Sequence, residues 1–259
     1  MNNKINIDVT APGKKTSKGH LHILTKTIRD FEDIFTKMGF EIASGPEVQS
    51  EHYNFDTLNV PKNHPSRDMQ DTFWVKDLVE TVLRTHTSGV QTRYMDSHQP
   101  PIRIVAPGRV YRNEAIDATH EAQFHQIEGL MVGETVSLAN LKATLLGFLR
   151  EWFENENLDL RIRPGFFPFV EPGIEVDMTC HKCGNSPVKT CNVCKGSGWI
   201  EIGGAGMVHP NVFKSVNIDS EKYQGWAFGF GIERMAMLKY GIDDIRNFYD
   251  GDIPFLKQF

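Results

Sequence analysis

The stretch GRVYRNEAIDATHEAQFHQIEGL, residues 108–130, contains two segments, GRVYRNE and FHQIEGL, on either side of a polar connection. Each is predicted to be a β-strand. Arg112 and Glu114 stand two positions apart, so we expect both side chains on the same face of the first strand. A guanidinium group can hold a phosphate, and a neighbouring carboxylate can accept a hydrogen bond from an amino group. Such a pair on its own is a weak signal, because exposed Arg and Glu side chains are often simply solvated.

Further strands and helices are predicted on both sides of this stretch. Apolar residues recur at helical spacing in residues 19–39, in residues 138–153 behind Ser137 as the N-cap, and after a glycine-rich segment at residues 227–231. Strands are predicted in PIRIVAP, LDLRIRP, GIEVDMT and WIEIGGAGMV, and in FEIASGPEV with a break at Gly45 and Pro46. The strands follow one another without a regular βαβ rhythm, which indicates an α+β fold with a mainly antiparallel sheet flanked by helices.

The composition is that of an ordinary globular protein and does not indicate a nucleic-acid partner. The 259 residues are 40% hydrophobic and 24% charged, with a formal net charge of −5. A chain of this length forms either one large domain or two small ones. The N-terminal residues lack the apolar core of a signal peptide, and no segment is long and uncharged enough to span a bilayer. We therefore expect a cytoplasmic protein without membrane contact, in a compartment where structural disulfides are rare.

The cysteines form one compact pattern. Cys180, Cys183, Cys191 and Cys194 follow the spacing C-x2-C-x7-C-x2-C and are all the cysteines in the chain. In a reducing compartment this spacing favours a tetrathiolate zinc site, and four sulfur ligands leave no open position, so the site would be structural. The alternative is a reduced hairpin without metal. Because alternating segments flank the cysteines, we expect two antiparallel strands whose connection, residues 180–194, is a zinc knuckle.

A second candidate for ligand binding is GFGIERMAML, residues 229–238. Its glycines would allow a flat ligand to approach the backbone, and Arg234 would stand at the start of the following helix. The plainer interpretation is an ordinary packing point between a strand and a helix. In the same way, the aromatic run FFPFVEPG, taken alone, favours a hydrophobic core over a ligand pocket.

In this order the segments resemble the class II aminoacyl-tRNA synthetases and, in detail, the alpha (catalytic) subunits of bacterial phenylalanyl-tRNA synthetases. The resemblance extends from about Asp8 to the last residue. It is carried by GHLHILTKTIRDFEDIFTKMGFEIASGPEV, YNFDTLNVPKNHPSRDMQDTFWV, LRTHTS, residues 102–130, FFPFVEPGIEVD, GAGMVHPNVF and residues 225–259. It implies one class II catalytic domain over residues 1–259, with residues 1–18 as an N-terminal arm. It also implies that the chain activates L-phenylalanine with ATP and Mg²⁺ and transfers it to tRNA(Phe).

The resemblance assigns roles to individual residues. Arg112 and Arg234 would hold the α- and γ-phosphates of ATP, and His120 would lie beside the phosphates; these three are the candidate catalytic residues. The candidate ATP-binding residues are Arg112, Glu114, Phe124, Gly229, Gly231 and Arg234. The candidate phenylalanine-binding residues are Trp74, His86, Ser88, Gln126, Glu128, Phe167, Phe169, Val170 and Ala227. Among these, Phe167 and Phe169 would pack on the substrate ring, Gln126 and Glu128 would accept from its ammonium group, and Ala227 would set the depth of the pocket.

The resemblance also implies a beta subunit in an α2β2 assembly. A homodimer through the first helix and the strand around Gly45 and Pro46 is the alternative. Compared with these alpha subunits, we expect no helical tRNA-binding arm in this sequence, and its Lys and Arg residues cluster only in KKTSK. We therefore expect tRNA charging to require the beta subunit. Two other functions remain open: a paralogue that makes an aminoacyl-adenylate for another acceptor or is regulatory, and a zinc-knuckle binding module without catalysis.

Overall fold

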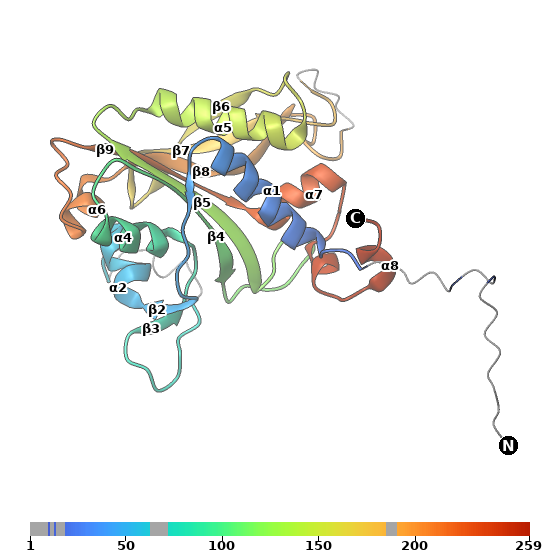
Figure 1. The fold of residues 1–259 in the computed structure, drawn as a ribbon, viewed down its shortest axis with the longest axis horizontal. Helices are drawn as coiled ribbons and strands as arrows, with labels where there is room; N and C mark the ends of the chain where they lie inside the picture. Colours follow the sequence, from blue (N-terminus) through green and yellow to red (C-terminus); the bar gives the residue numbers. More distant parts are fainter. Residues whose placement is uncertain (1–9, 11–12, 14–18, 63–71, 185–190) are drawn as a thin grey trace.

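The computed structural model describes residues 10, 13, 19–62, 72–184 and 191–259. These residues form a seven-stranded sheet in the order β1-β4-β5-β9-β8-β7-β6 (Figure 1). All neighbouring strands in the sheet are antiparallel except β1 and β4, which are parallel. The predicted mainly antiparallel α+β fold is confirmed.

The strands correspond closely to the alternating segments of the sequence. The large sheet consists of β1 (Glu41–Ile42), β4 (Ile102–Tyr111), β5 (Gln123–Gly133), β6 (Leu160–Phe167), β7 (Val170–Thr179), β8 (Trp199–Val208) and β9 (Gln224–Gly231). A small antiparallel sheet pairs β2 (Val48–Ser50) with β3 (Thr81–Leu83). The predicted break at Gly45 and Pro46 separates β1 from β2, so the chain leaves the large sheet for the small one at this point. The two segments PIRIVAP and GRVY form one continuous strand, β4.

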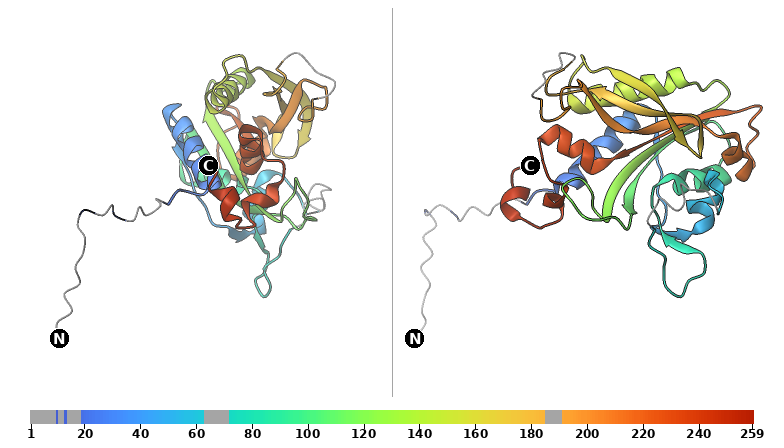
Figure 2. Two further views of the ribbon diagram at one scale, coloured as in Figure 1. Left: turned by 90° about the vertical axis from the view of Figure 1, so that its right-hand side faces the viewer. Right: turned by 180° about the vertical axis from the view of Figure 1, so that it is seen from behind.

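Helices cover both faces of the large sheet (Figures 1 and 2). One face carries α1 (Ile23–Lys37), α5 (Leu138–Phe153) and α7 (Ile232–Tyr240), and the other carries α4 (Ser88–Ser97) and α6 (Pro210–Ser215). The short helix α2 (Glu51–Asn54) packs against α4 and the small sheet. Short helical turns complete the fold as η1 (Asp56–Leu58), η2 (Ile245–Phe248) and α8 (Ile253–Leu256). Along β4, Val105 belongs to one core, while Ile104 and Ala106 belong to the other. This alternation follows from side chains that point to opposite faces of a strand.

Aromatic side chains hold the first face together. Phe31 of α1 packs edge-on against Trp152 of α5 with ring centroids 4.7 Å apart, and Phe35 stacks on Phe148 at 4.6 Å. All four are at most 1% exposed. Burial of each such side chain contributes about 1.5–3 kcal/mol relative to exposure. The apolar stripe predicted in residues 19–39 is thus the face by which α1 packs.

The predicted helix ends are confirmed in two cases and differ in one. Ser137 caps α5 and forms a capping box with Asn140, and Gly39, with φ of +83°, follows the end of α1. The start of α1 is later than predicted because the Nδ1 atom of His22 accepts from the Leu24 amide at 3.1 Å. Leu21 therefore lies outside the helix and is 46% exposed.

The connection between β7 and β8 carries the four cysteines. The two strands are antiparallel, as predicted, and Thr179 pairs with Trp199 at their end. Of this connection, residues 185–190 lie outside the described part of the chain. The same is true of the predicted arm at residues 1–18, apart from Thr10 and Gly13, and of residues 63–71.

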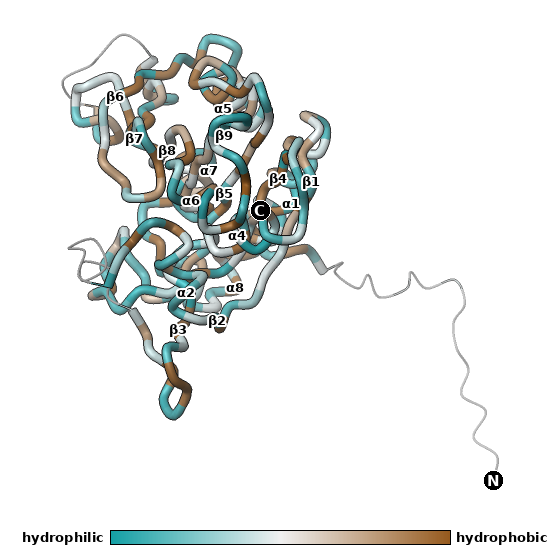
Figure 3. Tube along the Cα trace, turned by 90° about the vertical axis from the view of Figure 1, so that its left-hand side faces the viewer, coloured by the Kyte–Doolittle hydropathy of each residue, from teal (hydrophilic) through white to brown (hydrophobic). Residues whose placement is uncertain are grey.

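Exposed apolar side chains gather before β3. Figure 3 shows hydrophobic colour at the tip of the loop that leads into this strand, where Leu78 and Val79 are 55% and 88% exposed. Within the described ranges, no helix has both the length and the apolar character that crossing a bilayer requires.

Candidate active site

Two adjoining cavities open where the chain leaves β4 and enters β5, and both are lined by Arg112. The first has a volume of about 230 Å³ and the second about 190 Å³. Of the predicted phenylalanine contacts, the first cavity is lined by His86, Ser88, Gln126, Glu128, Phe167, Phe169, Val170 and Ala227. Gly229, which was predicted as an ATP contact, lines this first cavity and not the second. Of the predicted ATP contacts, the second cavity is lined by Arg112, Glu114, His120, Phe124, Gly231 and Arg234. The predicted contacts other than Trp74 therefore line two cavities, and the Arg112 side chain borders both.

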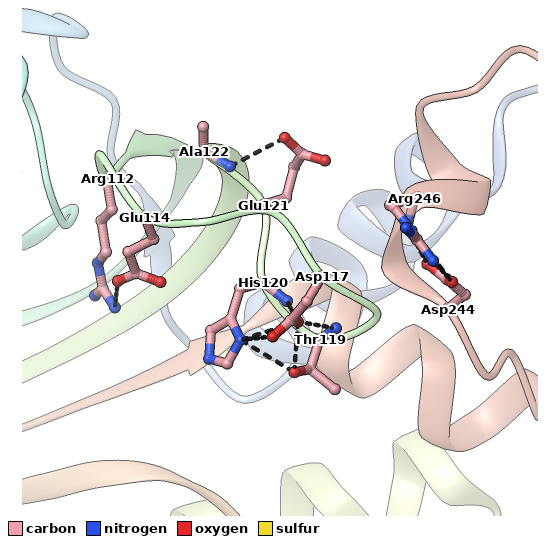
Figure 4. A network of polar contacts seen from close by, with 9 residues as sticks. All are labelled: Arg112, Glu114, Asp117, Thr119, His120, Glu121, Ala122, Asp244 and Arg246. Carbon is pink, nitrogen blue, oxygen red and sulfur yellow. Dashed lines mark hydrogen bonds and ion pairs between the residues drawn. The ribbon is translucent and has the colours of Figure 1, made fainter.

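Arg112 and Glu114 do not lie on a strand, contrary to the prediction. β4 ends at Tyr111, and a turn follows in which the Glu114 amide donates to the Arg112 carbonyl at 2.9 Å. The Nη1 atom of Arg112 lies 4.0 Å from the Glu114 carboxylate (Figure 4). The two side chains are therefore close to each other because of this turn, and not because they share one face of a strand. The Nε atom of Arg112 donates to the Thr85 carbonyl at 3.3 Å. Burial lowers the pKa of Arg112, but guanidinium groups remain charged in proteins, so a half-buried cation faces both cavities.

The second cavity combines two cationic side chains with an aromatic ring. Phe124 is on β5, and its ring centroid lies 5.1 Å from the guanidinium carbon of Arg112. Arg234 stands in the first turn of α7, directly after β9 ends at Gly231. The amino end of a helix attracts anions through its free N–H groups and its dipole. A cavity with this combination suits a polyphosphate that carries a flat base.

His120 enters the same cavity from the loop between β4 and β5 (Figure 4). Its Nδ1 atom lies 3.0 Å from the Asp117 carboxylate, which also accepts from the backbone amides of Thr119 at 2.7 Å and of His120 at 2.8 Å. These hydrogen bonds, the one from the Thr119 amide above all, hold the pKa of Asp117 well below its usual range. The loop is joined to η2 because the Ile245 amide donates to the Ala118 carbonyl at 3.0 Å. The imidazole is thus fixed at the cavity wall.

Glu128 anchors the polar side of the first cavity. Its carboxylate accepts from the Thr87 amide at 3.0 Å, the Ser88 hydroxyl at 2.6 Å and the Gln91 side-chain amide at 2.8 Å. Burial raises the pKa of Glu128, and the hydrogen bonds oppose this effect. Gln91 also lines the cavity and was missed by the sequence analysis. The signal for it was available, since Gln91 is three residues after Ser88 and therefore on the same face of α4.

Two buried polar atoms of the first cavity have no hydrogen-bond partner among the described residues. They are the Oε1 atom of Gln126 and the Nδ1 atom of His86. Burial, with a further contribution from Arg112, lowers the pKa of His86 to about 3, so this imidazole is neutral at pH 7. Unpaired polar atoms in a protein interior are rare and costly. Their presence in a cavity wall indicates a ligand with polar groups of its own.

The opposite wall of the first cavity is apolar and aromatic. The rings of Phe167 and Phe169 lie 6.0 Å apart at an interplanar angle of 25°. Gly204 lies under Phe167, and a Cβ atom at this glycine would be 2.6 Å from the ring. Ala227, a small residue on β9, also lines the cavity. The space is thus bounded by aromatic faces and small residues, which suits an aromatic side chain.

Trp74 is not brought together with the other predicted contacts. Its backbone pairs with Val82 beside β3, and its side chain is 55% exposed. It lines neither of the two cavities.

The four cysteines form a separate cluster. Their Sγ atoms all lie within 4.8 Å of one another, with 3.8 Å between Cys180 and Cys191 and 3.4 Å between Cys183 and Cys194. A tetrahedral site with Zn–S bonds of about 2.3 Å places its sulfurs about 3.8 Å apart. The Gly198 amide donates to the Cys194 Sγ at 3.3 Å, as is favourable for a thiolate. The donor set therefore fits a structural zinc ion.

Comparisons with known proteins agree with this geometry at the level of class. The family model described as the tRNA synthetases class II core domain (F) matches residues 6–259. The solved structure of pyrrolysyl-tRNA synthetase from Desulfitobacterium hafniense has a similar fold, with a TM-score of 0.64. The two sequences are 17% identical, and the match covers 89% of this chain and 74% of the synthetase chain. The chain has the core fold of a class II aminoacyl-tRNA synthetase.

Two relatives narrow the class to a family. The phenylalanine–tRNA ligase alpha subunit of Anoxybacillus flavithermus is 56% identical over 255 residues, and that of Streptococcus agalactiae serotype III is 55% identical over 256 residues. Each match covers 98% of this chain and 72% of the relative. The chain belongs to the family of phenylalanine–tRNA ligase alpha subunits. The predicted family and enzyme class, a ligase of the aminoacyl-tRNA synthetase type, are confirmed, and the two other functions left open by the sequence are not favoured.

Proposed function

We propose that the chain activates L-phenylalanine with ATP, giving phenylalanyl-adenylate and pyrophosphate, and transfers the phenylalanyl group to tRNA(Phe). The observation that carries the proposal is that Arg112 lines both cavities. One cavity suits an aromatic amino acid and the other a nucleotide, and the reaction joins these two molecules through a phosphate. The family supports the same activity.

In the first step a carboxylate oxygen of phenylalanine attacks the α-phosphorus of ATP, and the bond to pyrophosphate breaks. The attacking carboxylate is already ionised at neutral pH, so no general base is needed. The reaction then depends on positioning and on stabilising the charge that develops on phosphorus. Arg112, between the cavities, would stabilise this charge, and Arg234 would bind the leaving end of the nucleotide. Phe124 would stack on adenine while Glu114 accepts from its amino group.

The polar and apolar walls of the first cavity would hold the amino acid by its two ends. The ammonium group supplies donors for Glu128 and for the unpaired Oε1 atom of Gln126. The benzyl ring would pack on Phe167 and Phe169, with Ala227 limiting its depth. An apolar cavity rejects an added hydroxyl group only moderately, so discrimination against tyrosine by this cavity alone would be limited.

The cofactors and partners follow from the same assignment. Class II synthetases in general use ATP and Mg²⁺. We propose that the cysteine cluster holds one structural zinc ion, which would stabilise the end of the β7–β8 hairpin. The alpha-subunit names of the relatives support a beta subunit as partner, and we propose an α2β2 assembly that charges tRNA(Phe). We also propose that residues 1–259 form a single catalytic domain.

The test is exchange of labelled pyrophosphate into ATP by the full chain, purified together with its beta subunit. We expect exchange that requires phenylalanine and Mg²⁺. Absence of exchange in a folded complex would contradict the proposal. Charging of tRNA(Phe) by the same complex then separates a synthetase from a paralogue that passes the aminoacyl group to another acceptor: exchange without charging would favour the paralogue.

A further inference from the structure

Glu233 is a buried carboxylate that the mechanism above does not use. It is in the first turn of α7, directly before Arg234, and is 1% exposed. Its two oxygens each lie 2.9 Å from the backbone nitrogen of His125 on β5. One of them also lies 2.8 Å from the Nδ1 atom of the same histidine and accepts from the Tyr249 hydroxyl at 2.5 Å. A single carboxylate thus connects α7, β5 and the residue that follows η2.

The hydrogen bond to the His125 amide replaces a missing strand contact. β5 and β9 pair so that Gln126 lies opposite Gly231. The same register would place Ile232 opposite His125, but Ile232 begins α7, and the chain has left the sheet. The His125 amide would then lose the partner that a longer β9 would supply. The side chain of Glu233 accepts this hydrogen bond from the helix, so the pairing of β5 with the segment that carries Arg234 extends past the end of the strand.

His125 stands between two proposed substrate contacts, because Phe124 precedes it and Gln126 follows it. Glu233, which accepts the hydrogen bond from the His125 amide, directly precedes Arg234 in the chain. The carboxylate therefore fixes the distance between Phe124 and Arg234, which line the second cavity from two different elements. Burial and the negative charge of Glu233 raise the pKa of Tyr249 far above its usual range, which keeps the hydroxyl protonated as a donor.

We propose that Glu233 is a positioning residue for the nucleotide: it holds Arg234 and Phe124 at the separation at which both can contact ATP. This inference rests on the proposed function for the identity of the nucleotide. It does not assign a contact between Glu233 and the reacting atoms.

The test is Glu233→Gln in the full chain with its beta subunit. Glutamine has nearly the same shape, but if its oxygen keeps the contacts of Oε1, its amide nitrogen takes the place of Oε2, 2.9 Å from the His125 backbone nitrogen, so that two donors face each other. Since loss of acceptors in a buried network costs on the order of a tenfold change in an equilibrium, we expect the KM for ATP to rise about tenfold. The KM for phenylalanine should change less than about twofold, because the first cavity does not depend on this contact. Tyr249→Phe removes one donor and should raise the KM for ATP in the same direction but by less.

A matched control is Glu201→Gln, which changes a carboxylate on β8 that is 62% exposed and pairs with Arg163. Both KM values should stay at those of the unchanged chain. If Glu233 only stabilises the fold, its variant will lower the melting temperature and the amount of active enzyme without separating the two KM values. Equal rises in both KM values, or no change in the KM for ATP, would also overturn the inference.

A second measurement separates this inference from the proposed function. Binding of a fluorescent ATP analogue, measured without phenylalanine, should be about tenfold weaker in Glu233→Gln and unchanged in Glu201→Gln. If the unchanged complex binds the analogue but shows no phenylalanine-dependent exchange, the proposed function fails while the role of Glu233 is still tested. If the analogue binds equally to Glu233→Gln and the unchanged complex, the inference fails alone.

Discussion

The guanidinium carbon of Arg112 lies 5.1 Å from the centroid of the Phe124 ring. The two residues come from opposite sides of the loop that joins β4 to β5, yet both line the second cavity. A base stacked on Phe124 would therefore have its phosphates within reach of a cation that also borders the first cavity.

Arg112→Gln should reduce the turnover of pyrophosphate exchange by at least about a hundredfold, because it removes the charge that would stabilise the transition state. The effect on the KM for phenylalanine should be smaller. Arg103→Gln is the matched control, since Arg103 is an exposed residue of β4, the strand that ends just before Arg112. Exchange rates for the two variants, normalised to folded complex, provide the measurement. Similar exchange rates in the two variants would show that Arg112 does not stabilise the transition state.

Ala227→Gly should enlarge the first cavity at its floor. We expect kcat/KM for phenylalanine analogues with a substituent at the ring tip to rise about tenfold relative to phenylalanine, as is typical when a pocket gains the space of one methyl group. Ala139→Gly makes the same change at an exposed position of α5 and should leave selectivity as it is. If Ala227→Gly and Ala139→Gly show the same selectivity, the floor of the pocket has been assigned to the wrong residue.

The cysteine cluster should contain about one zinc ion per chain in protein purified without chelator. Cys183→Ser removes one ligand, so we expect loss of metal and a lower melting temperature, because binding energy at a structural site is folding energy. Lys182→Ala changes a neighbour whose side chain donates to Asn192 and should keep the metal. Elemental analysis and thermal unfolding provide the two readouts. If the original chain, purified without chelator, contains no metal, the four cysteines are free thiols and the zinc site is wrong.

The buried His86 should make stability depend on pH. Its folded pKa is about 3 and its ordinary value is 6.5, so between these values the unfolded chain binds the proton more strongly. Stability should therefore be independent of this group above pH about 6.5 and fall by roughly 1 kcal/mol per pH unit below it. His86→Gln should flatten this dependence between pH 6.5 and 5, as measured by urea unfolding. Parallel stability curves for the two proteins would show that His86 does not titrate as inferred.

Local patterns predicted the elements of this fold well. The capping box at Ser137 and the stop at Gly39 depend on a few neighbouring residues, so the sequence shows them directly. The alternating segments that became β7 and β8 likewise report a local period, and their connection through the cysteines suggested their pairing. The exception is Arg112, which was placed on a strand although β4 ends at Tyr111. Arg112, Asn113 and Glu114 are all polar, so no local pattern marks the residue at which the strand ends and the turn begins.

The candidate site came from the family resemblance, and the structure adds what depends on contacts between distant segments. The network of Glu233 with His125 and Tyr249 joins residues up to 124 positions apart, so no local pattern indicates it. Gln91, by contrast, follows Ser88 at helical spacing and could have been predicted. Trp74 lies outside both cavities, and its role as a phenylalanine contact stays a prediction.

The most direct measurement is a crystal structure of the alpha–beta complex with a non-hydrolysable phenylalanyl-adenylate analogue. We expect the benzyl ring against Phe167, the adenine on Phe124, and the linking phosphate in contact with Arg112. A ligand that occupies only one of the two cavities, or an analogue bound with Arg112 turned away from its phosphate, would contradict the proposed function.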